Sequence, residues 1–272
     1  MAAVLAVAAF AIARQLPPAG ANALLHPLRQ HVLTAPPASC DSATFTGADV
    51  VLKGWRCRTS QPRRGTLVYL HGVADNRASA AGFVSRFGRR GLDVIAYDSR
   101  GHGESDGTLC TYGFFEKDDL RRVIDTLAPG PVVLLGTSLG AAVAIQEAAL
   151  DPRVTTVVAA ETFSDLRTVA TERAPFFFTR AAIERSFRLA EEQAHFRVDA
   201  VSPVAAAASI RIPVLLIHGA ADTETPPAHS QRVLAALAGP KQLILVPGAR
   251  HNQSLGGEVW TDIERWIDHN IP

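Results

Sequence analysis

The feature that most restricts the fold of this chain is a repeated order of short apolar runs and helical stretches. Each run is rich in branched or apolar residues and ends in a loop of Gly, Asp, Ser or His, and a stretch with helical character follows. Strands that are apolar on both faces and alternate with helices are typical of parallel sheets covered on both sides. The pattern therefore predicts an α/β fold with a mostly parallel central sheet and helices on both faces.

The expected elements follow from this pattern. Strands are expected at 49–58, 66–70, 92–97, 132–135, 154–160, 212–217 and 243–246. Helices are expected at 79–90, 114–127, 139–150, 227–238 and 257–269. In such sheets, ligands bind beyond the carboxyl ends of the strands. The loops that follow the strands are therefore where functional residues are expected.

The sharpest motif is Gly136-Thr137-Ser138-Leu139-Gly140, which lies between an apolar strand and an Ala-rich helix. It is G-x-S-x-G in the strand, turn and helix context that marks a serine nucleophile. The glycines permit a tight turn that lifts the hydroxyl out of the sheet, and a helix N-terminus favours developing negative charge. An ordinary helix cap uses the same residue types, but the partners described next favour Ser138 as a nucleophile.

Two further residues suit the chemistry of that serine, because a hydroxyl is a weak nucleophile until a base takes its proton. Among nine histidines, His251 follows the last expected strand, on the same edge of the sheet as Ser138. An imidazole needs a carboxylate to fix its tautomer and stabilise its charged form. Asp222 follows the preceding strand, and Glu161 and Asp165 are its rivals. The sequence predicts Ser138, His251 and Asp222 as a catalytic triad.

Two backbone donors are needed for the negative charge that develops on the substrate oxygen. One is expected to be the N–H of Leu139, directly after Ser138. The other is expected in the loop after strand 66–70, where Val73 is the first choice and Ala74 is the alternative. The sequence thus predicts an oxyanion hole formed by Val73 and Leu139.

The segment 161–209 interrupts the alternation and is longer than one crossover requires, so we interpret it as an inserted helical cap. Its aromatic side chains, together with Phe114 and Phe115, suggest an apolar pocket for an acyl or alcohol group. Ordinary core packing is the alternative role for these rings. The phenylalanines of the segment are Phe163, Phe176, Phe177, Phe178, Phe187 and Phe196.

These motifs resemble the α/β-hydrolase superfamily, in particular its bacterial serine aminopeptidase S33-like or BEM46-like group, over residues 44–271. Asp98–Ser105 is similar to the family's D-x-R-G-x-G-x-S loop, which implies that Asp98 and Arg100 brace the floor of the site. Asp199–Pro203 resembles the family's return from cap to sheet. A nucleophilic serine separates the chain from dehalogenases, which use aspartate. The resemblance implies the α/β-hydrolase fold.

Composition bears on other functions and on the compartment. The 27 basic and 26 acidic residues nearly cancel, so no strong field favours nucleic acid. No phosphate loop, dinucleotide fingerprint or metal-ligand cluster is present in the sequence, so neither a cofactor nor a metal is expected. The three cysteines fit no zinc pattern and are expected to be free thiols. A Cys40–Cys57 disulfide is the alternative, and it would require export.

The N-terminus permits two interpretations. Residues 1–13 form an apolar run that is short for a membrane-spanning helix and suits a signal-peptide core or a membrane association. No basic residue precedes the run, so a cytoplasmic protein with an apolar N-terminal helix is equally compatible. We expect a leader, anchor or lead-in over 1–39, and one hydrolase domain over 40–272 that includes the cap.

The expected function is hydrolysis of small carboxylic esters with an apolar group, through an acyl-enzyme on Ser138. The same triad would serve an amidase, an aminopeptidase or a thioesterase. A non-catalytic ligand-binding protein on the hydrolase scaffold is the alternative from another class. An aminopeptidase would need a carboxylate in the cap to hold the substrate's amino group. The candidates for that role are Glu172, Glu184, Glu191 and Glu192.

Overall fold

The computed structural model describes residues 2–271, with side chains from residue 14 onward. In that part of the chain, one eight-stranded sheet has the order β1-β2-β4-β3-β5-β6-β7-β8. β1 pairs with β2 and β2 with β4 in antiparallel fashion, and all other neighbours are parallel. The strands are β1 (Cys40–Thr46), β2 (Val51–Cys57), β3 (Gly65–Leu70), β4 (Leu92–Tyr97), β5 (Val132–Thr137), β6 (Val154–Ala160), β7 (Val214–Gly219) and β8 (Lys241–Val246).

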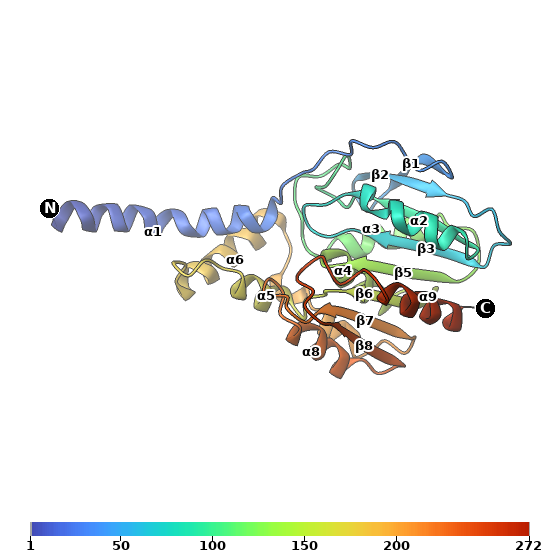
Figure 1. Ribbon diagram of the computed structural model, residues 1–272. Coiled ribbons are helices and arrows are strands. Elements are labelled where there is room, and N and C mark those ends of the chain that lie inside the picture. The colour runs from blue at the N-terminus through green and yellow to red at the C-terminus, as the bar shows by residue number, and fades with distance from the viewer. Residues whose placement is uncertain (1, 272) are drawn as a thin grey trace.

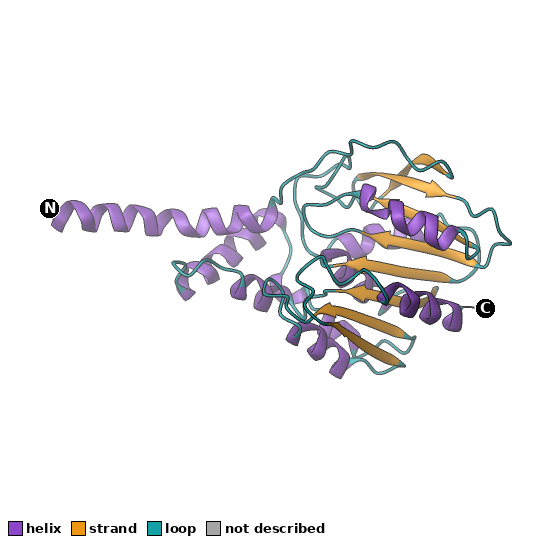
Figure 2. Cartoon of the chain, viewed as in Figure 1, coloured by secondary structure: helices purple, strands orange, loops and turns teal. Residues whose placement is uncertain are grey.

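Helices cover both faces of this sheet, which confirms the predicted α/β fold (Figure 2). One face packs against α2 and α9, and the other packs against α3, α4, α7 and α8. The helices are α1 (Ala2–Leu25), α2 (Ala81–Gly88), α3 (Glu116–Ile124), α4 (Leu139–Ala148), α5 (Leu166–Glu172), α6 (Arg180–Ala194), α7 (Pro203–Ala207), α8 (Ala228–Ala236) and α9 (Val259–Asn270). Short 3-10 turns lie at Arg77–Ala80 and Val198–Ala200.

The central strands are apolar throughout because both of their faces are buried. In β5, Val132 and Leu134 pack into the core on the α4 side, and Val133 and Leu135 pack into the core on the α9 side. Burial of each such side chain contributes roughly 1.5–3 kcal/mol. All strands expected from the pattern are present, with bounds within two residues of the expected ones.

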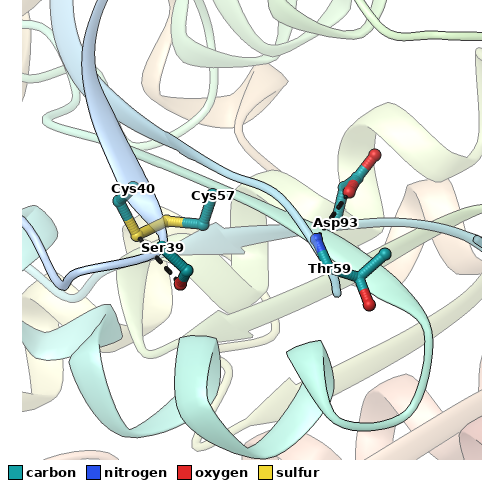
Figure 3. The surroundings of a disulfide bond; sticks show 5 residues. All are labelled: Ser39, Cys40, Cys57, Thr59 and Asp93. Carbon is teal, nitrogen blue, oxygen red and sulfur yellow. Dashed lines mark hydrogen bonds between the residues drawn. A yellow bond between two sulfur atoms is a disulfide. The ribbon is translucent and has the colours of Figure 1, made fainter. Parts of the chain in front are cut away.

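The sequence pattern does not predict the edge strand β1, because few of its residues are apolar. Of its seven residues only Phe45 is fully buried, and the others are exposed or half-buried. β1 pairs with β2, and this register places Cys40 opposite Cys57. The two cysteines form a disulfide (Figure 3), so the expectation of free thiols is wrong for this pair. Of the cysteines described, Cys110 is free and buried.

The start of the chain is helical well beyond its apolar run over residues 1–13. α1 continues to Leu25, although Pro17 and Pro18 lie inside it and each removes a backbone donor. Ala21 and Leu25 are fully buried in a core that they share with the cap. This tertiary packing holds the helix together where the local sequence disfavours it.

The segment between β6 and β7 contains α5, α6, the second 3-10 turn and α7. The far end of α1 projects away from the sheet, and α6 lies beside its C-terminal half (Figure 1). The membrane association predicted through residues 1–13 concerns side chains outside the described ones. Within the described part of the chain, no helix combines the length and the apolar character that a bilayer crossing requires.

Candidate active site

The turn between β5 and α4 holds Ser138 in a backbone conformation that side-chain-bearing residues rarely adopt, with φ 49° and ψ −110°. Such a conformation costs on the order of 1–3 kcal/mol and persists only where its surroundings enforce it. A Cβ added to Gly136 would lie 2.3 Å from the Gly140 carbonyl, and one added to Gly140 would lie 2.1 Å from the Leu70 oxygen. Only glycine therefore fits two residues before and two residues after the serine.

The side chains of the three predicted triad residues meet at the carboxyl edge of the sheet. His251 Nε2 lies 3.0 Å from Ser138 Oγ, and His251 Nδ1 lies 2.6 Å from Asp222 Oδ2. Ser138 is 5% exposed and Asp222 is 3% exposed. With its proton on Nδ1, the imidazole donates to the carboxylate and accepts from the hydroxyl. This arrangement can carry the serine proton to the imidazole.

The loop after β7 stabilises the charged form of Asp222. The backbone N–H groups of Glu224 and Thr225 each donate to Asp222 Oδ1 at 2.9 Å, and His218 Nε2 lies 3.3 Å from Oδ2. Burial alone would raise the pKa of the Asp222 carboxyl. The hydrogen bonds from His218, His251 and the Thr225 backbone outweigh that effect, so the pKa lies well below its ordinary value. Asp222 is therefore an anion that can stabilise an imidazolium.

A second carboxylate, Glu161, lies against the same histidine. Its Oε2 is 3.7 Å from His251 Nδ1, and its oxygens accept the backbone N–H groups of Asn252 at 2.5 Å and Ser254 at 3.0 Å. Glu161 is 1% exposed and has a φ of 57° at the end of β6. The sequence offers this residue only as a rival to Asp222. The structure places it as a clamp on the loop that carries His251.

Glu161, Asp222 and His251 each present one atom that could bind a metal ion, and these atoms lie within 4.8 Å of one another. The same atoms already serve the hydrogen bonds of the site. His251 Nδ1 is bonded to Asp222, and the Glu161 oxygens hold two backbone N–H groups. A metal ion would have to break these bonds, so the set fits a proton relay better than a metal centre.

The two predicted oxyanion donors lie on segments adjacent to the serine. Leu139 is the first residue of α4. The loop after β3 approaches from the other side, since a Cβ added to Gly72 would lie 3.6 Å from the Ser138 Cβ. Val73 directly follows Gly72, is half-buried and packs against the core. The roles of Val73 and Leu139 as donors stay predictions.

Below the site, buried charges fix the loop after β4. The Asp98 carboxylate accepts the backbone N–H groups of Arg77 at 2.7 Å and Glu104 at 2.8 Å, and it pairs with the Arg77 guanidinium. Arg100 donates to Asp119 at 2.7 Å. Asp98 and Arg100 thus make bracing contacts of the kind that the resemblance implies.

The acidic residues of the cap are mostly engaged by neighbours. Glu172 pairs with a histidine of α8 and Glu184 with an arginine of α5, both at 2.8 Å. Glu191 accepts a backbone N–H at 2.9 Å, and Glu192 is exposed. Three of the four carboxylates considered for an aminopeptidase therefore already have partners.

Comparison with known proteins places this geometry in context. A model of the alpha/beta hydrolase family matches residues 67–258. The uncharacterized protein YfhR of Salmonella typhi is 30% identical over 268 residues, which cover 89% of this chain and 84% of that protein. The esterase Pf2001 of Pyrococcus furiosus has a TM-score of 0.73 at 20% identity, over 92% of this chain and 99% of its own. An acetyl xylan esterase of Paenibacillus sp. R4 has a TM-score of 0.68 at 21% identity, over 94% and 92%. The two solved structures share the fold.

Proposed function

Because this chain belongs to the alpha/beta hydrolase family, we propose that it is a serine hydrolase that cleaves carboxylic esters through an acyl-enzyme. One observation carries the proposal, namely the continuous hydrogen-bonded path from Ser138 Oγ through His251 to Asp222. Nucleophile, base and orienting acid in hydrogen-bond reach of one another are the recurring arrangement for acyl transfer. Asp222 remains an anion and His251 cycles between its neutral and protonated forms.

In the acylation step, Ser138 Oγ attacks the acyl carbon of the ester while its proton passes to His251 Nε2. A C–O bond forms, and the carbonyl electron pair moves onto the oxygen. The backbone N–H groups of Leu139 and Val73 are the proposed donors to that oxyanion. When the oxyanion collapses, the bond to the alcohol oxygen breaks, and the alcohol leaves with the proton from His251.

In the deacylation step, water takes the place of the alcohol. His251 removes one of its protons as the water oxygen attacks the acyl carbon, and a second oxyanion forms. Collapse breaks the bond to Ser138 Oγ, which regains a proton from His251, and the carboxylic acid is released. Each step returns the imidazole to its starting form.

Ester cleavage is favoured over aminopeptidase action by the state of the cap. An aminopeptidase needs a free carboxylate that can hold the substrate's ammonium group. Three of the four candidates, Glu172, Glu184 and Glu191, already have partners. The fourth, Glu192, is exposed. An ester with an apolar acyl or alcohol group needs no such charge.

Replacement of the nucleophile tests the proposal. Ser138→Ala should lower kcat for p-nitrophenyl butyrate by roughly 10³-fold or more and abolish labelling by a fluorophosphonate probe. Ser209→Ala is a matched control, because Ser209 is exposed and bonds only to the backbone of α7. Ester turnover by the Ser138→Ala variant at the rate of the parent would refute the proposal.

A further inference from the structure

A cavity of about 450 Å³ lies between the C-terminal half of α1 and the cap helices α5 and α6. Its walls are largely apolar. They include Ala23 and Leu24 from α1, Val169 and Ala170 from α5, and Phe187 from α6. This volume falls within the range of about 300–1,000 Å³ that is usual for small-molecule sites. The triad residues are not part of these walls.

The α1 wall of the cavity is a fixed part of the fold. A Cβ added to Gly20 would lie 2.4 Å from Ser186 Oγ, so the backbone of α1 approaches α6 as closely as glycine allows. Ala21, which directly follows Gly20, and Leu25 are fully buried in the core shared with the cap. The N-terminal helix therefore shapes the cavity and does not merely lie over it.

Hydrogen bonds connect the cavity to the catalytic edge. Arg173, which lines the cavity, donates from Nε to the Glu224 carbonyl at 2.8 Å and from Nη2 to Thr225 Oγ1 at 2.6 Å. The Thr225 backbone N–H donates in turn to Asp222 Oδ1 at 2.9 Å. Two hydrogen bonds thus link Arg173, which lines the cavity, to Asp222 through Thr225.

A ring contact connects the cavity to the segment beside the nucleophile. Tyr112, another lining residue, packs edge-on to Phe163 with ring centroids 6.3 Å apart. Phe163 follows β6 by three residues, and the last residue of β6, Ala160, accepts the Ser138 backbone N–H at 2.8 Å. Both connections link residues of the cavity wall to segments that carry or adjoin the catalytic residues.

We propose that this cavity receives a hydrocarbon chain of the substrate, so that α1 forms one wall of the substrate site. The inference rests on the proposed ester hydrolysis and extends it to a substrate class. Among the described residues that line the cavity, none carries a carboxylate. The Ser186 hydroxyl donates to the Ala182 carbonyl at 2.9 Å, and the Arg173 guanidinium is bonded to the Asp222 loop. A polar ligand would lose its hydration and form few hydrogen bonds in exchange. A hydrocarbon chain gains about 25 cal/mol per Å² of buried apolar surface.

The test fills the cavity from α1. Ala23→Trp places a large ring in it, and Asn22→Trp places the same ring on the neighbouring position, which is exposed and does not line the cavity. One assay series compares p-nitrophenyl acetate with p-nitrophenyl octanoate, and a second compares ethyl acetate with octyl acetate. The first detects a chain in the acyl group and the second a chain in the alcohol.

We expect Ala23→Trp to lower kcat/KM for the long-chain ester of one series by about tenfold or more, which corresponds to roughly 1.4 kcal/mol. The short esters should change by less than about twofold, and Asn22→Trp should behave like the parent throughout. Ala170→Trp fills the cavity from α5 and should give the same result. If Ala23→Trp does not fold, Leu24→Ala, which enlarges the cavity, should shift the preference toward longer chains.

The outcomes separate this inference from the proposed function. Turnover that depends on Ser138, with the same chain-length preference in the parent, in Ala23→Trp and in Ala170→Trp, would overturn the cavity assignment alone. Ester turnover that persists in Ser138→Ala, or no turnover of any ester, would overturn the proposed function and the cavity assignment with it.

Discussion

Two buried carboxylates lie near Nδ1 of His251, and they accept hydrogen bonds from different groups. Asp222 accepts directly from Nδ1 at 2.6 Å, whereas Glu161 is 3.7 Å from that atom and has its oxygens bonded to the next residues of the loop. The backbone of Glu161 is strained, with a φ of 57°. Such a conformation persists where surrounding contacts, here those of its carboxylate, enforce it. We interpret Glu161 as a positioning residue that fixes the histidine loop.

Glu161→Gln should lower kcat/KM for an ester by roughly tenfold, because the amide turns an N–H group toward a backbone donor and costs about 1–2 kcal/mol. Steady-state kinetics of ester hydrolysis measure this effect.

The control for this prediction is Asp165→Asn, at a carboxylate that caps α5 by accepting the Thr168 N–H at 2.8 Å. It should leave kcat/KM close to that of the parent. An unchanged kcat/KM in Glu161→Gln would show that the residue has no role in positioning His251.

Among the elements, α1 depends most on contacts with distant parts of the chain. Two prolines interrupt its backbone hydrogen bonds, and its local sequence does not predict a helix beyond the apolar run. Leu25 is fully buried at its end, and its carbonyl accepts the Cys110 N–H at 2.8 Å. The C-terminal half of the helix is therefore part of the packed domain.

Leu25→Ala should lower the free energy of unfolding by about 2–5 kcal/mol, because it removes a fully buried side chain and leaves a cavity. Leu28→Ala should change it by less than about 0.5 kcal/mol, since Leu28 is 72% exposed. Chemical denaturation of the full chain measures both values. Equal effects of the two substitutions would mean that the end of α1 is not packed as described.

At the scale of the whole molecule, buried histidines below the active site make stability depend on pH. Burial lowers the pKa of His102 to about 4 from its ordinary 6.5, and the neighbouring His71 adds to this effect. His102 Nδ1 donates to the Arg100 carbonyl at 2.9 Å, and its Nε2 has no hydrogen-bond partner. The folded protein therefore keeps this imidazole neutral in a range where the unfolded chain protonates it.

Because the folded-state pKa is depressed, the unfolded chain binds the extra proton, and stability falls as the pH drops from about 6.5 to about 4. His102→Gln should reduce this loss of stability by about 3 kcal/mol, because each unit of pKa difference between the folded and unfolded states corresponds to roughly 1.4 kcal/mol. Unfolding free energies measured between pH 7.5 and pH 4.5 test it. His31→Gln, at an exposed histidine, should keep the slope of the parent. A parental slope in His102→Gln would contradict the prediction.

Much of the fold and the placement of Ser138, Asp222 and His251 could be predicted because their signals are local. A strand buried on both faces needs an apolar side chain at nearly every position, and the turn around Ser138 admits only glycine at Gly136 and Gly140. These requirements act on consecutive residues. Parallel strands then bring the loops that follow them to a common edge, so position along the chain predicts which side chains meet.

The tertiary structure alone decided the β1 strand, its disulfide, the helix through Pro17 and Pro18, the clamp by Glu161 and the cavity beside α1. Each depends on free energy that two separate segments of the chain supply jointly. An edge strand forms because its neighbour offers hydrogen bonds, and a helix with two prolines persists because the cap buries one side of it. Neither segment carries that information in its own residues, so only their packing reveals it.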